Sequence, residues 1–185
     1  MRRGPNVVLD VPRSADRADF LALVRASRAF HRGRAMPPST PESFARYLAR
    51  TRRTDHAALV VRRQSDMVLI GALELSQIVR GRFHSAYLGY WVGAPYAGQG
   101  FMTEAVGLAL AHAFGSLRLH RIEANVQPDN AASLAIVRRL GFTREGYSRR
   151  YLRLGGRWRD HERWAILRED WRARRAAPHR RERAT

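Results

Sequence analysis

The chain of 185 residues has the length of one compact domain, and its 45% hydrophobic content is enough for a single sizeable core. It contains no cysteine, which excludes disulfides, thiolate metal sites and a cysteine nucleophile that carries an acyl group. The seven histidines show no metal-binding spacing, and the formal net charge of +18 favours attraction to polyanions. No apolar run approaches the roughly 18 residues that span a bilayer, and no signal-type segment follows the first residues, so we expect a cytoplasmic protein.

The N-terminal part of the chain predicts one strand and two helices. Residues 7–11 form the expected strand, and Ser14 is the expected N-cap of a helix that carries apolar residues up to position 24. Residues 33–39 break the pattern. Thr40 followed by Pro41 then predicts the start of a second helix.

From residue 57 the period of the apolar residues changes to that of strands. Strands are expected at 57–62, 68–78 and 84–92 as an antiparallel meander, followed by a helix at 102–114 that is rich in small residues. A strand at 122–126 and a helix at 131–140, ended by Gly141, precede a hairpin of strands 142–152 and 157–167. Residues 172–185 are nearly all Arg and Ala, which predicts a disordered tail.

The clearest functional signal follows the aromatic strand at 87–92. The sequence AGQGFM at 97–102 opens a helix, and a strand, a glycine loop and a helix in this order form an anion site. Two glycines alone are a weak signal, since they more often serve a tight turn. A Walker loop is excluded because GxxxxGK[ST] and lysine are absent, and a dinucleotide fingerprint is excluded because Thr103 stands where a third glycine is needed.

Two linked blocks resemble the GNAT acetyltransferases. The loop at 97–102 resembles the family's Q/R-x-x-G-x-G/A motif, with Ala97 in place of Gln or Arg and Met102 in place of the small last residue. NAAS at 130–133 and LGF at 140–142 resemble the family's N-x-x-S and L-G-F signatures. The resemblance covers about residues 7–171 and is closest to the bacterial Rim-type (RimJ/RimL) branch, which acetylates the N-termini of ribosomal proteins.

This resemblance implies a three-layer α+β domain over residues 1–171. Its sheet is expected to be mixed, mostly antiparallel and of about seven strands, splayed between the fourth and the fifth. It implies acetyl-CoA with its diphosphate on the glycine loop, its pantetheine arm beside the aromatic strand and its thioester between the splayed strands. The expected cofactor-binding residues are Trp91, Val92, Ala97, Gly98, Gln99, Gly100, Phe101, Met102, Asn130, Ser133 and Arg138.

The proton transfers are harder to assign. An α-amine with a pKa of about 8 is only partly neutral at neutral pH, so a base is useful. A related branch uses a Glu and a Tyr, but the resemblance places Asn125 and Val137 at those positions, and neither can replace them. We therefore predict a water held by Glu123 and Asn125, which share a strand face, as the base, and Ser133 as the acid toward the coenzyme sulfur.

Each of these assignments has an alternative. Ser133 is equally explained by a first-turn hydrogen bond in its helix. Glu74 and Asp160 also lie on strands near the expected acceptor mouth, and an ordinary ion pair with an arginine explains them, like Glu123, better than catalysis does. The remaining candidates for the acceptor channel, although aromatic residues at strand period are more often core residues, are Trp91, Tyr147, Tyr151 and Trp158.

The predicted function is acetyl-CoA-dependent N-acetylation of a primary amine by a monomer or homodimer. A protein N-terminal α-amine is the first choice of acceptor, and small amines or aminoglycosides are the alternatives. The alternative from another class is a catalytically silent GNAT-fold module that binds RNA or ribosomes through its arginines. All 34 basic residues are arginine, so a bias in composition explains the charge as well as a nucleic-acid site does.

Overall fold

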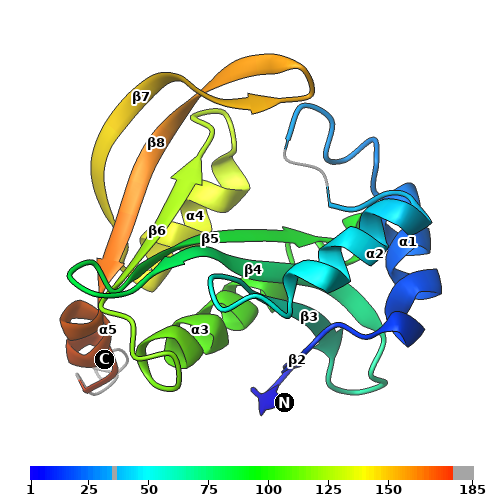
Figure 1. The fold of residues 1–185 in the computed structure, drawn as a ribbon, viewed down its shortest axis with the longest axis horizontal. Coiled ribbons are helices and arrows are strands. Elements are labelled where there is room, and N and C mark those ends of the chain that lie inside the picture. The colour runs from blue at the N-terminus through cyan, green and yellow to red at the C-terminus, as the bar shows by residue number, and fades with distance from the viewer. Residues whose placement is uncertain (35–36, 177–185) are drawn as a thin grey trace, which may run out of the picture.

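The computed structural model describes residues 1–34 and 37–176, which build one eight-stranded sheet flanked by helices (Figure 1). The strand order is β1-β2-β3-β4-β5-β6-β8-β7, and every neighbouring pair is antiparallel except β5 and β6. The strands are β1 (Arg2–Arg3), β2 (Val7–Asp10), β3 (Ala57–Arg63), β4 (Leu69–Val79), β5 (Ser85–Val92), β6 (Arg121–Val126), β7 (Thr143–Leu154) and β8 (Arg157–Leu167). The helices are η1 (Ser14–Asp16), α1 (Arg17–Ala26), α2 (Pro41–Arg50), η2 (Ala94–Tyr96), α3 (Phe101–Phe114), α4 (Ala131–Leu140) and α5 (Arg168–Ala176).

The mixed, mostly antiparallel sheet confirms the predicted architecture, with one strand more than the predicted seven. The extra strand is β1, in which Arg2 pairs with Leu9 and Arg3 with Val8 of β2. Two polar residues show no alternation of apolar and polar side chains, so the sequence pattern does not reveal such a strand.

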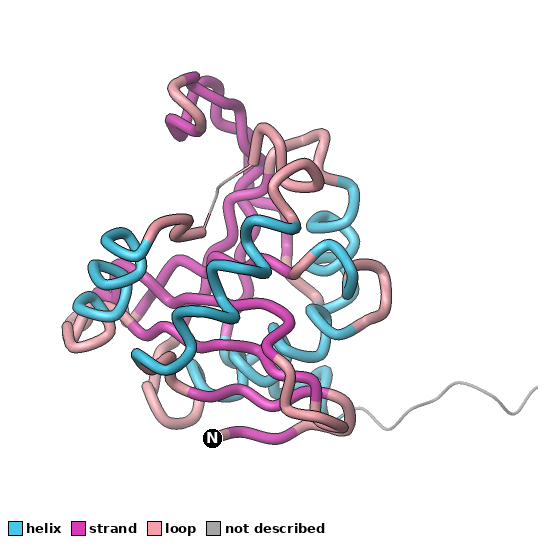
Figure 2. Tube along the Cα trace, turned by 90° about the vertical axis from the view of Figure 1, so that its right-hand side faces the viewer, coloured by secondary structure: helices cyan, strands magenta, loops and turns pink. Residues whose placement is uncertain are grey.

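The helices cover both faces of the sheet, as the tube in Figure 2 shows from the side. On one face, α1 and α2 bury Phe20 and Phe44, whose ring centroids lie 5.0 Å apart, against Val60 and Ala72 of the sheet. On the other face, α3 packs across β2, β4, β5 and β6. This helix is close to the sheet because its inward side chains are small: its alanines at 105, 109 and 113 are fully buried.

The two predicted helix starts have different outcomes. Thr40 caps α2 as predicted, since its hydroxyl accepts a hydrogen bond from the backbone of Ser43 (3.2 Å). The prediction for Ser14 is wrong, because this residue lies inside the 3-10 turn η1. Asp16 precedes α1 instead, and its carboxylate accepts a hydrogen bond from the backbone N–H of Arg13 (2.7 Å).

The parallel strands β5 and β6 pair over a short distance only. Their register joins Ser85, Ala86 and Tyr87 to residues 121–123, although β5 continues to Val92 and β6 to Val126. The sheet therefore splays in its middle, between the fourth and fifth of the seven predicted strands, as expected.

The last two strands form the predicted hairpin, which arches over one end of the sheet (Figure 1). The prediction of a disordered tail from residue 172 is wrong for its first residues, because α5 continues to Ala176. Trp171 packs against the main core, and Arg174 donates a hydrogen bond to the carbonyl of Arg139 (3.1 Å), so these contacts hold an Arg-rich segment in place. Residues 177–185 lie outside the described residues.

Candidate active site

A cleft of about 820 Å³ opens where β5 and β6 diverge. One side is formed by the glycine loop and the first turns of α3 and α4, and the other by the connection between α1 and α2 together with the final hairpin. The cleft thus collects side chains from segments that are far apart in the sequence.

The glycine loop presents unpaired backbone N–H groups at the start of α3. In the part of the chain that the structure describes, the N–H groups of residues 98–103 donate no hydrogen bond. Gly98 and Gly100 line the cleft with φ angles of 75° and 83°, and no atom lies within 4 Å of a Cβ built on either residue. Positive φ without side chains lets a ligand reach these amides, and the helix dipole there favours an anion such as a diphosphate.

The other loop residues contribute in different ways. Ala97 and Met102 line the cleft, as predicted. The side chain of Gln99 donates a hydrogen bond back to the carbonyl of Pro95 (2.8 Å), and Phe101 packs against the core. The predictions for Gln99 and Phe101 therefore depend on their backbone N–H groups alone.

The edge of β5 beyond Tyr87 faces the gap between the strands. The N–H of Gly93 donates a hydrogen bond to the carbonyl of Ile70 in β4 (2.8 Å). Because the backbone N–H and C=O groups of successive residues point to opposite sides of a strand, this bond defines which residues of β5 pair with β4 and which face away from it. By this alternation the backbone groups of Trp91 pair with β4, whereas those of Tyr90 and Val92 point into the gap. The residues whose backbone is open to a ligand are thus Tyr90 and Val92, so the prediction for Trp91 is wrong as regards its backbone, although Trp91 lines the cleft.

Residues 31–34, which follow α1, contact both sides of this gap. His31 donates from Nε2 to the carbonyl of Val92 (2.7 Å), because a carbonyl can only accept. Arg34 forms an ion pair with Asp129 in the turn before α4 (2.5 Å). The two contacts tie this segment to both sides of the gap.

Two hydroxyl groups meet across the gap at the start of α4. Asn130 caps this helix by accepting a hydrogen bond from the N–H of Ser133 (3.3 Å), and both residues line the cleft, as predicted. The Ser133 hydroxyl lies 2.6 Å from the hydroxyl of Tyr90, a residue that the sequence did not single out. Burial raises the pKa of Tyr90 to about 12, although the hydrogen bond with Ser133 opposes the shift, so the phenol is protonated at neutral pH.

The arginine that reaches the cleft is Arg139 rather than Arg138. The guanidinium of Arg138 lies over the ring of Trp164, 5.5 Å from its centroid, and Arg138 does not line the cleft. Neighbouring helical residues point about 100° apart, so only one of the two can face the site. The prediction for Arg138 is therefore wrong.

The predicted pair of Glu123 and Asn125 is not brought together at the site. Glu123 accepts a hydrogen bond from Arg121 (2.9 Å), which also pairs with Glu145, and Glu123 does not line the cleft. Asn125 does line it, and its buried Oδ1 has no hydrogen-bond partner among the described residues. The structure therefore does not support a base formed by the two side chains together, because Glu123 lies outside the cleft and its Oε1 is bonded to Arg121.

Of the other carboxylates considered, Glu74 is in the cleft and Asp160 is not. Glu74 lies 3.3 Å from Nε2 of His56, whose pKa is lowered mainly by burial although the carboxylate opposes this shift. Asp160 accepts hydrogen bonds from the hydroxyl of Tyr147 (2.6 Å) and the N–H of Arg150 (2.7 Å). Its position on the hairpin outside the cleft removes it from the candidates.

The hairpin lines the cleft with Leu152 and Leu154 and with two side chains that carry polar groups. Tyr151 lines it, as expected, whereas Tyr147 and Trp158 are exposed and outside it. His161 of β8 is buried and lines the cleft, with its ring 6.1 Å from that of Tyr151. The sequence did not single out His161, because one histidine in a strand shows no pattern by itself.

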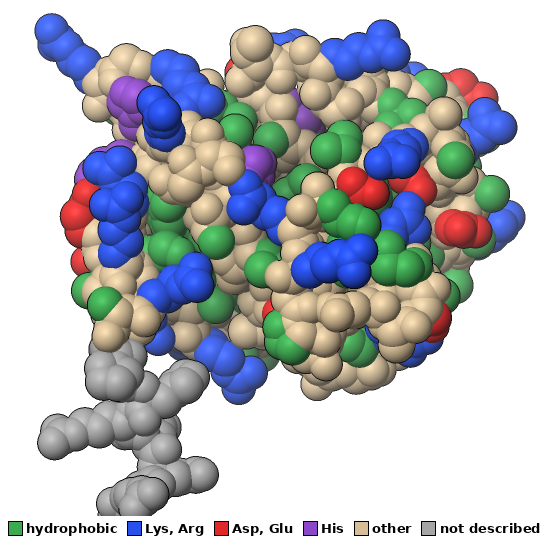
Figure 3. All heavy atoms as spheres, turned by 90° about the horizontal axis from the view of Figure 1, so that it is seen from below, with side chains coloured by type: hydrophobic (Ala, Val, Ile, Leu, Met, Phe, Trp, Pro, Cys, Tyr) green, Lys and Arg blue, Asp and Glu red, His purple; other side chains and the backbone are tan. Residues whose placement is uncertain are grey.

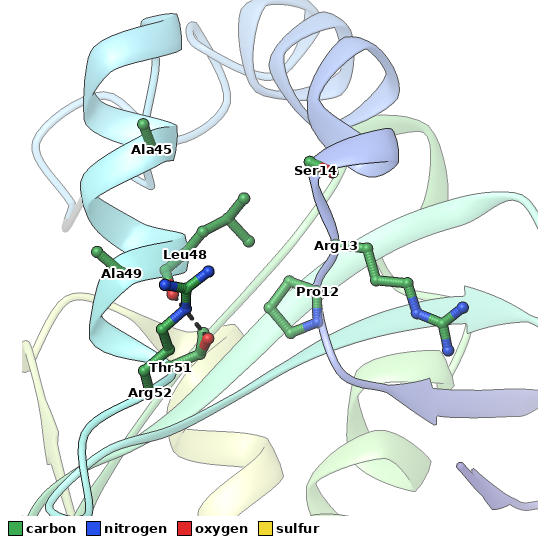
Figure 4. Close-up of a pocket in the computed structure, with 8 residues that line it drawn as sticks. All are labelled: Pro12, Arg13, Ser14, Ala45, Leu48, Ala49, Thr51 and Arg52. Atoms are coloured by element: carbon green, nitrogen blue, oxygen red, sulfur yellow. Dashed lines mark hydrogen bonds between the residues drawn. The ribbon is translucent and has the colours of Figure 1, made fainter.

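A second, smaller hollow lies between η1 and α2 (Figure 4). It has a volume of about 400 Å³, and in the view the side chain of Arg13 points away from it. The Thr51 hydroxyl is already bonded to the carbonyl of Leu48 (2.7 Å). Within residues 1–34 and 37–176 we find no cluster of side chains that could hold a metal and no helix long and apolar enough to cross a membrane.

The anion loop, the splayed strands and the cap at Asn130 occur together in one known family. Residues 6–143 match the family model of the acetyltransferase (GNAT) domain. The chain belongs to the GNAT acetyltransferase family. This confirms the resemblance seen in the two sequence blocks.

Several solved structures and curated proteins are similar to this chain. RimJ from Mycobacterium smegmatis, solved in complex with CoA-disulfide, is 30% identical with a TM-score of 0.80, over 90% of this chain and 87% of that one. The ribosomal-protein-S5-alanine acetyltransferase from Vibrio fischeri is 26% identical with a TM-score of 0.80, over 92% and 97%. The curated [ribosomal protein uS5]-alanine N-acetyltransferase of Escherichia coli is 43% identical over 56% of this chain and 53% of its own length. The alignments thus span little more than half the length of the curated relatives.

Proposed function

We propose that this protein is an acetyl-CoA-dependent N-acetyltransferase. The observation that carries the proposal is the row of unpaired N–H groups at residues 98–103 beside an open sheet edge at Tyr90 and Val92. The loop amides would bind the diphosphate, and the edge of β5 would pair with the pantetheine arm as a neighbouring strand does. The carbonyl of Val92 already accepts a hydrogen bond from His31, so the pantetheine arm would use its second lone pair or displace the imidazole.

The proposed acceptor is a primary amine, and first of all the N-terminal α-amine of a protein. The support comes from the relatives, since proteins that acetylate the alanine of a ribosomal protein are similar to this chain in sequence and in fold. The carboxylate of Glu74 in the cleft would attract an ammonium group electrostatically. Cytoplasmic location and association with ribosomes fit such an acceptor and are part of the proposal.

The reaction requires one bond change and one net proton transfer. The amine nitrogen attacks the acetyl carbon, the C–S bond breaks, and the nitrogen loses the proton that the sulfur finally gains. The absence of cysteine favours direct transfer without an acyl-enzyme on sulfur. We assign the proton of the leaving thiolate to Ser133, and the support is its position at the positive end of α4 and its hydrogen bond with Tyr90.

The experiment combines binding with turnover. Acetyl-CoA is expected to raise the melting temperature, and free thiol should be released with a peptide that begins with alanine but not with the same peptide blocked at its N-terminus. Release with spermidine or an aminoglycoside alone would transfer the proposal to small amines. Absence of any cofactor-dependent shift would contradict it, and a shift without turnover on any amine would favour the silent GNAT-fold module.

A further inference from the structure

His161 occupies a position in the cleft that faces the open side of the splay. It directly precedes the stretch of β8 in which Glu162 pairs with Val126 and Arg163 with Asn125 of β6. Because side chains alternate along a strand, His161 lies on the same face as Arg163 and therefore on the face of Asn125. It is only 2% exposed and yet lines the cleft.

The hydrogen bond of His161 defines its tautomer. Nδ1 lies 3.0 Å from the carbonyl oxygen of Arg159, and since a carbonyl only accepts, Nδ1 carries the hydrogen. In the neutral ring, Nε2 then has a free lone pair, and within the described residues it makes no hydrogen bond. Burial lowers the pKa of His161 below the usual value of a histidine, so the ring is neutral at pH 7.

We propose that Nε2 of His161 accepts the proton that the acceptor amine loses during acetyl transfer. The C–N bond forms as the C–S bond breaks, the proton on nitrogen passes to Nε2, and the imidazolium later releases it to solvent. The thiolate receives its proton separately from Ser133, and solvent then reprotonates the Ser133 oxygen, so the net change is one proton moved from nitrogen to sulfur. This assignment depends on the proposed function, and it replaces the predicted water between Glu123 and Asn125.

The charges around His161 suit a group that becomes positive for a short time. Asp160, its neighbour on β8, and Asp129, in the turn before α4, both favour the protonated ring. Arg159 and Arg163 flank His161 on the same strand face and oppose them. The near side chains on the adjoining strands, Tyr151 on β7 and Asn125 on β6, add no carboxylate. Asp129 is itself paired with Arg34 and Asp160 with Tyr147, so both carboxylates act on the ring through their charge and not by direct contact.

Glu74, the other candidate base in the cleft, is placed differently. Its carboxylate already has His56 as a partner at 3.3 Å, and it lies on β4, on the far side of β5 from the splay. His161 lies on β8, the strand beside β6, and lines the same cleft as the open edge of β5, where the thioester is expected. Glu74 is therefore better suited to attract the ammonium group than to take its proton.

The variant His161→Asn separates catalysis from structure. Its side-chain amide can still donate to the carbonyl of Arg159, but it has no group at the position of Nε2. With acetyl-CoA and an alanine-starting peptide, we expect kcat/KM at pH 7 to fall about 100-fold or more, as when a general base is lost. The KM for acetyl-CoA should be unchanged, and His112→Asn, a matched change of a histidine in α3 outside the cleft, should keep wild-type activity.

The pH profile supplies the second measurement. In the wild type, lowering the pH below the pKa of His161 should reduce kcat/KM more than protonation of the acceptor amine alone would. Protonated His161 cannot accept a proton, and it repels an ammonium ion. This additional acid limb should be missing in His161→Asn. A variant with unchanged activity and profile would overturn the assignment to His161 and leave the proposed function intact.

Nitrogen-15 NMR of the wild-type protein tests the assignment without turnover. The expected spectrum at pH 7.5 shows protonated Nδ1 and unprotonated Nε2, and the Nε2 resonance shifts when the alanine-starting peptide is added together with CoA. A proton on Nε2 at this pH would overturn the proposal even if the enzyme is active. Absence of turnover in the wild type with every amine, in contrast, would refute the proposed function itself.

Discussion

At the scale of single residues, the pair of Tyr90 and Ser133 decides how the leaving sulfur can be protonated. A phenol is a stronger acid than an aliphatic alcohol, so Tyr90 is the better donor across their 2.6 Å contact and Ser133 the better acceptor. With Tyr90 as the donor, the Ser133 hydroxyl hydrogen is left to point into the cleft. The tyrosine therefore orients the group that is proposed to meet the coenzyme.

Removal of this hydroxyl should slow the chemical step more than it weakens binding. In Tyr90→Phe we expect kcat to fall by up to about tenfold, the size of one neutral hydrogen bond, with little change in the KM for acetyl-CoA. In a Ser133→Ala background the same substitution should have no further effect, because the hydroxyl that it orients is gone. Equal effects in both backgrounds would show that Tyr90 acts independently of Ser133, and Tyr87→Phe, also in the cleft, serves as the control.

The glycine loop offers a second test with a closely matched control. Gly100 and Gly81 both have positive φ, 83° and 67°, and open space at the Cβ position, but only Gly100 belongs to the cleft. Valine at either position should lower the free energy of unfolding by about 1–2 kcal/mol through backbone strain. Only Gly100→Val should lose CoA binding in titration calorimetry. Normal binding by this variant would show that the diphosphate lies elsewhere.

The sequence revealed those site residues whose role depends on a short contiguous pattern. Two features are of this kind: the loop with Gly98 and Gly100 before α3, and the cap at Asn130 before α4. In each case the start of a single helix supplies all the groups involved. His161 was missed because its role depends on a carbonyl two residues away and on the strand beside it. The structure brings Arg139 to the cleft in place of the predicted Arg138, because the rotation of α4 against β8 decides which of the two faces the site, and the spacing along the helix does not define that rotation.

At the scale of elements, the helix that follows the hairpin shows the limit of composition as a guide. The Arg and Ala content of α5 predicted disorder from residue 172, but a single aromatic residue just before that point anchors the segment. Trp171 packs against the core near Gly107 of α3. Tertiary contact of one large side chain thus overrides the composition of the residues after it.

This anchoring can be measured by equilibrium unfolding in urea. Trp171→Ala should lower the free energy of unfolding by about 2 kcal/mol, less than for a fully buried tryptophan because Trp171 is half-buried. Trp158→Ala is the control, since that side chain is 60% exposed on the hairpin, and it should change stability by less than about 0.5 kcal/mol. Equal losses in both variants would contradict the contact of α5 with the core.

At the scale of the whole molecule, the charge is spread rather than concentrated. Figure 3 shows arginine side chains distributed over the face seen from below, with few acids between them. Such a surface attracts anions over a long range, and salt screens this attraction. We expect acetyl-CoA binding to weaken as the salt concentration rises from about 0.05 M to about 0.5 M, while a contact made only by the loop amides would be nearly insensitive to salt.

The gap between β5 and β6 also makes the sheet an incomplete structure. The backbone groups of Tyr90 and Val92 that point into the gap have no strand to pair with. A ligand that lies along β5 would form the hydrogen bonds that a neighbouring strand forms elsewhere in the sheet. Binding and folding are then coupled: CoA at about 100 times its dissociation constant should add about 2.7 kcal/mol to the free energy of unfolding. Hydrogen exchange would locate the effect, because the amides of Tyr90 and Val92 should exchange more slowly with CoA bound, while those at the hairpin tip should keep their rates.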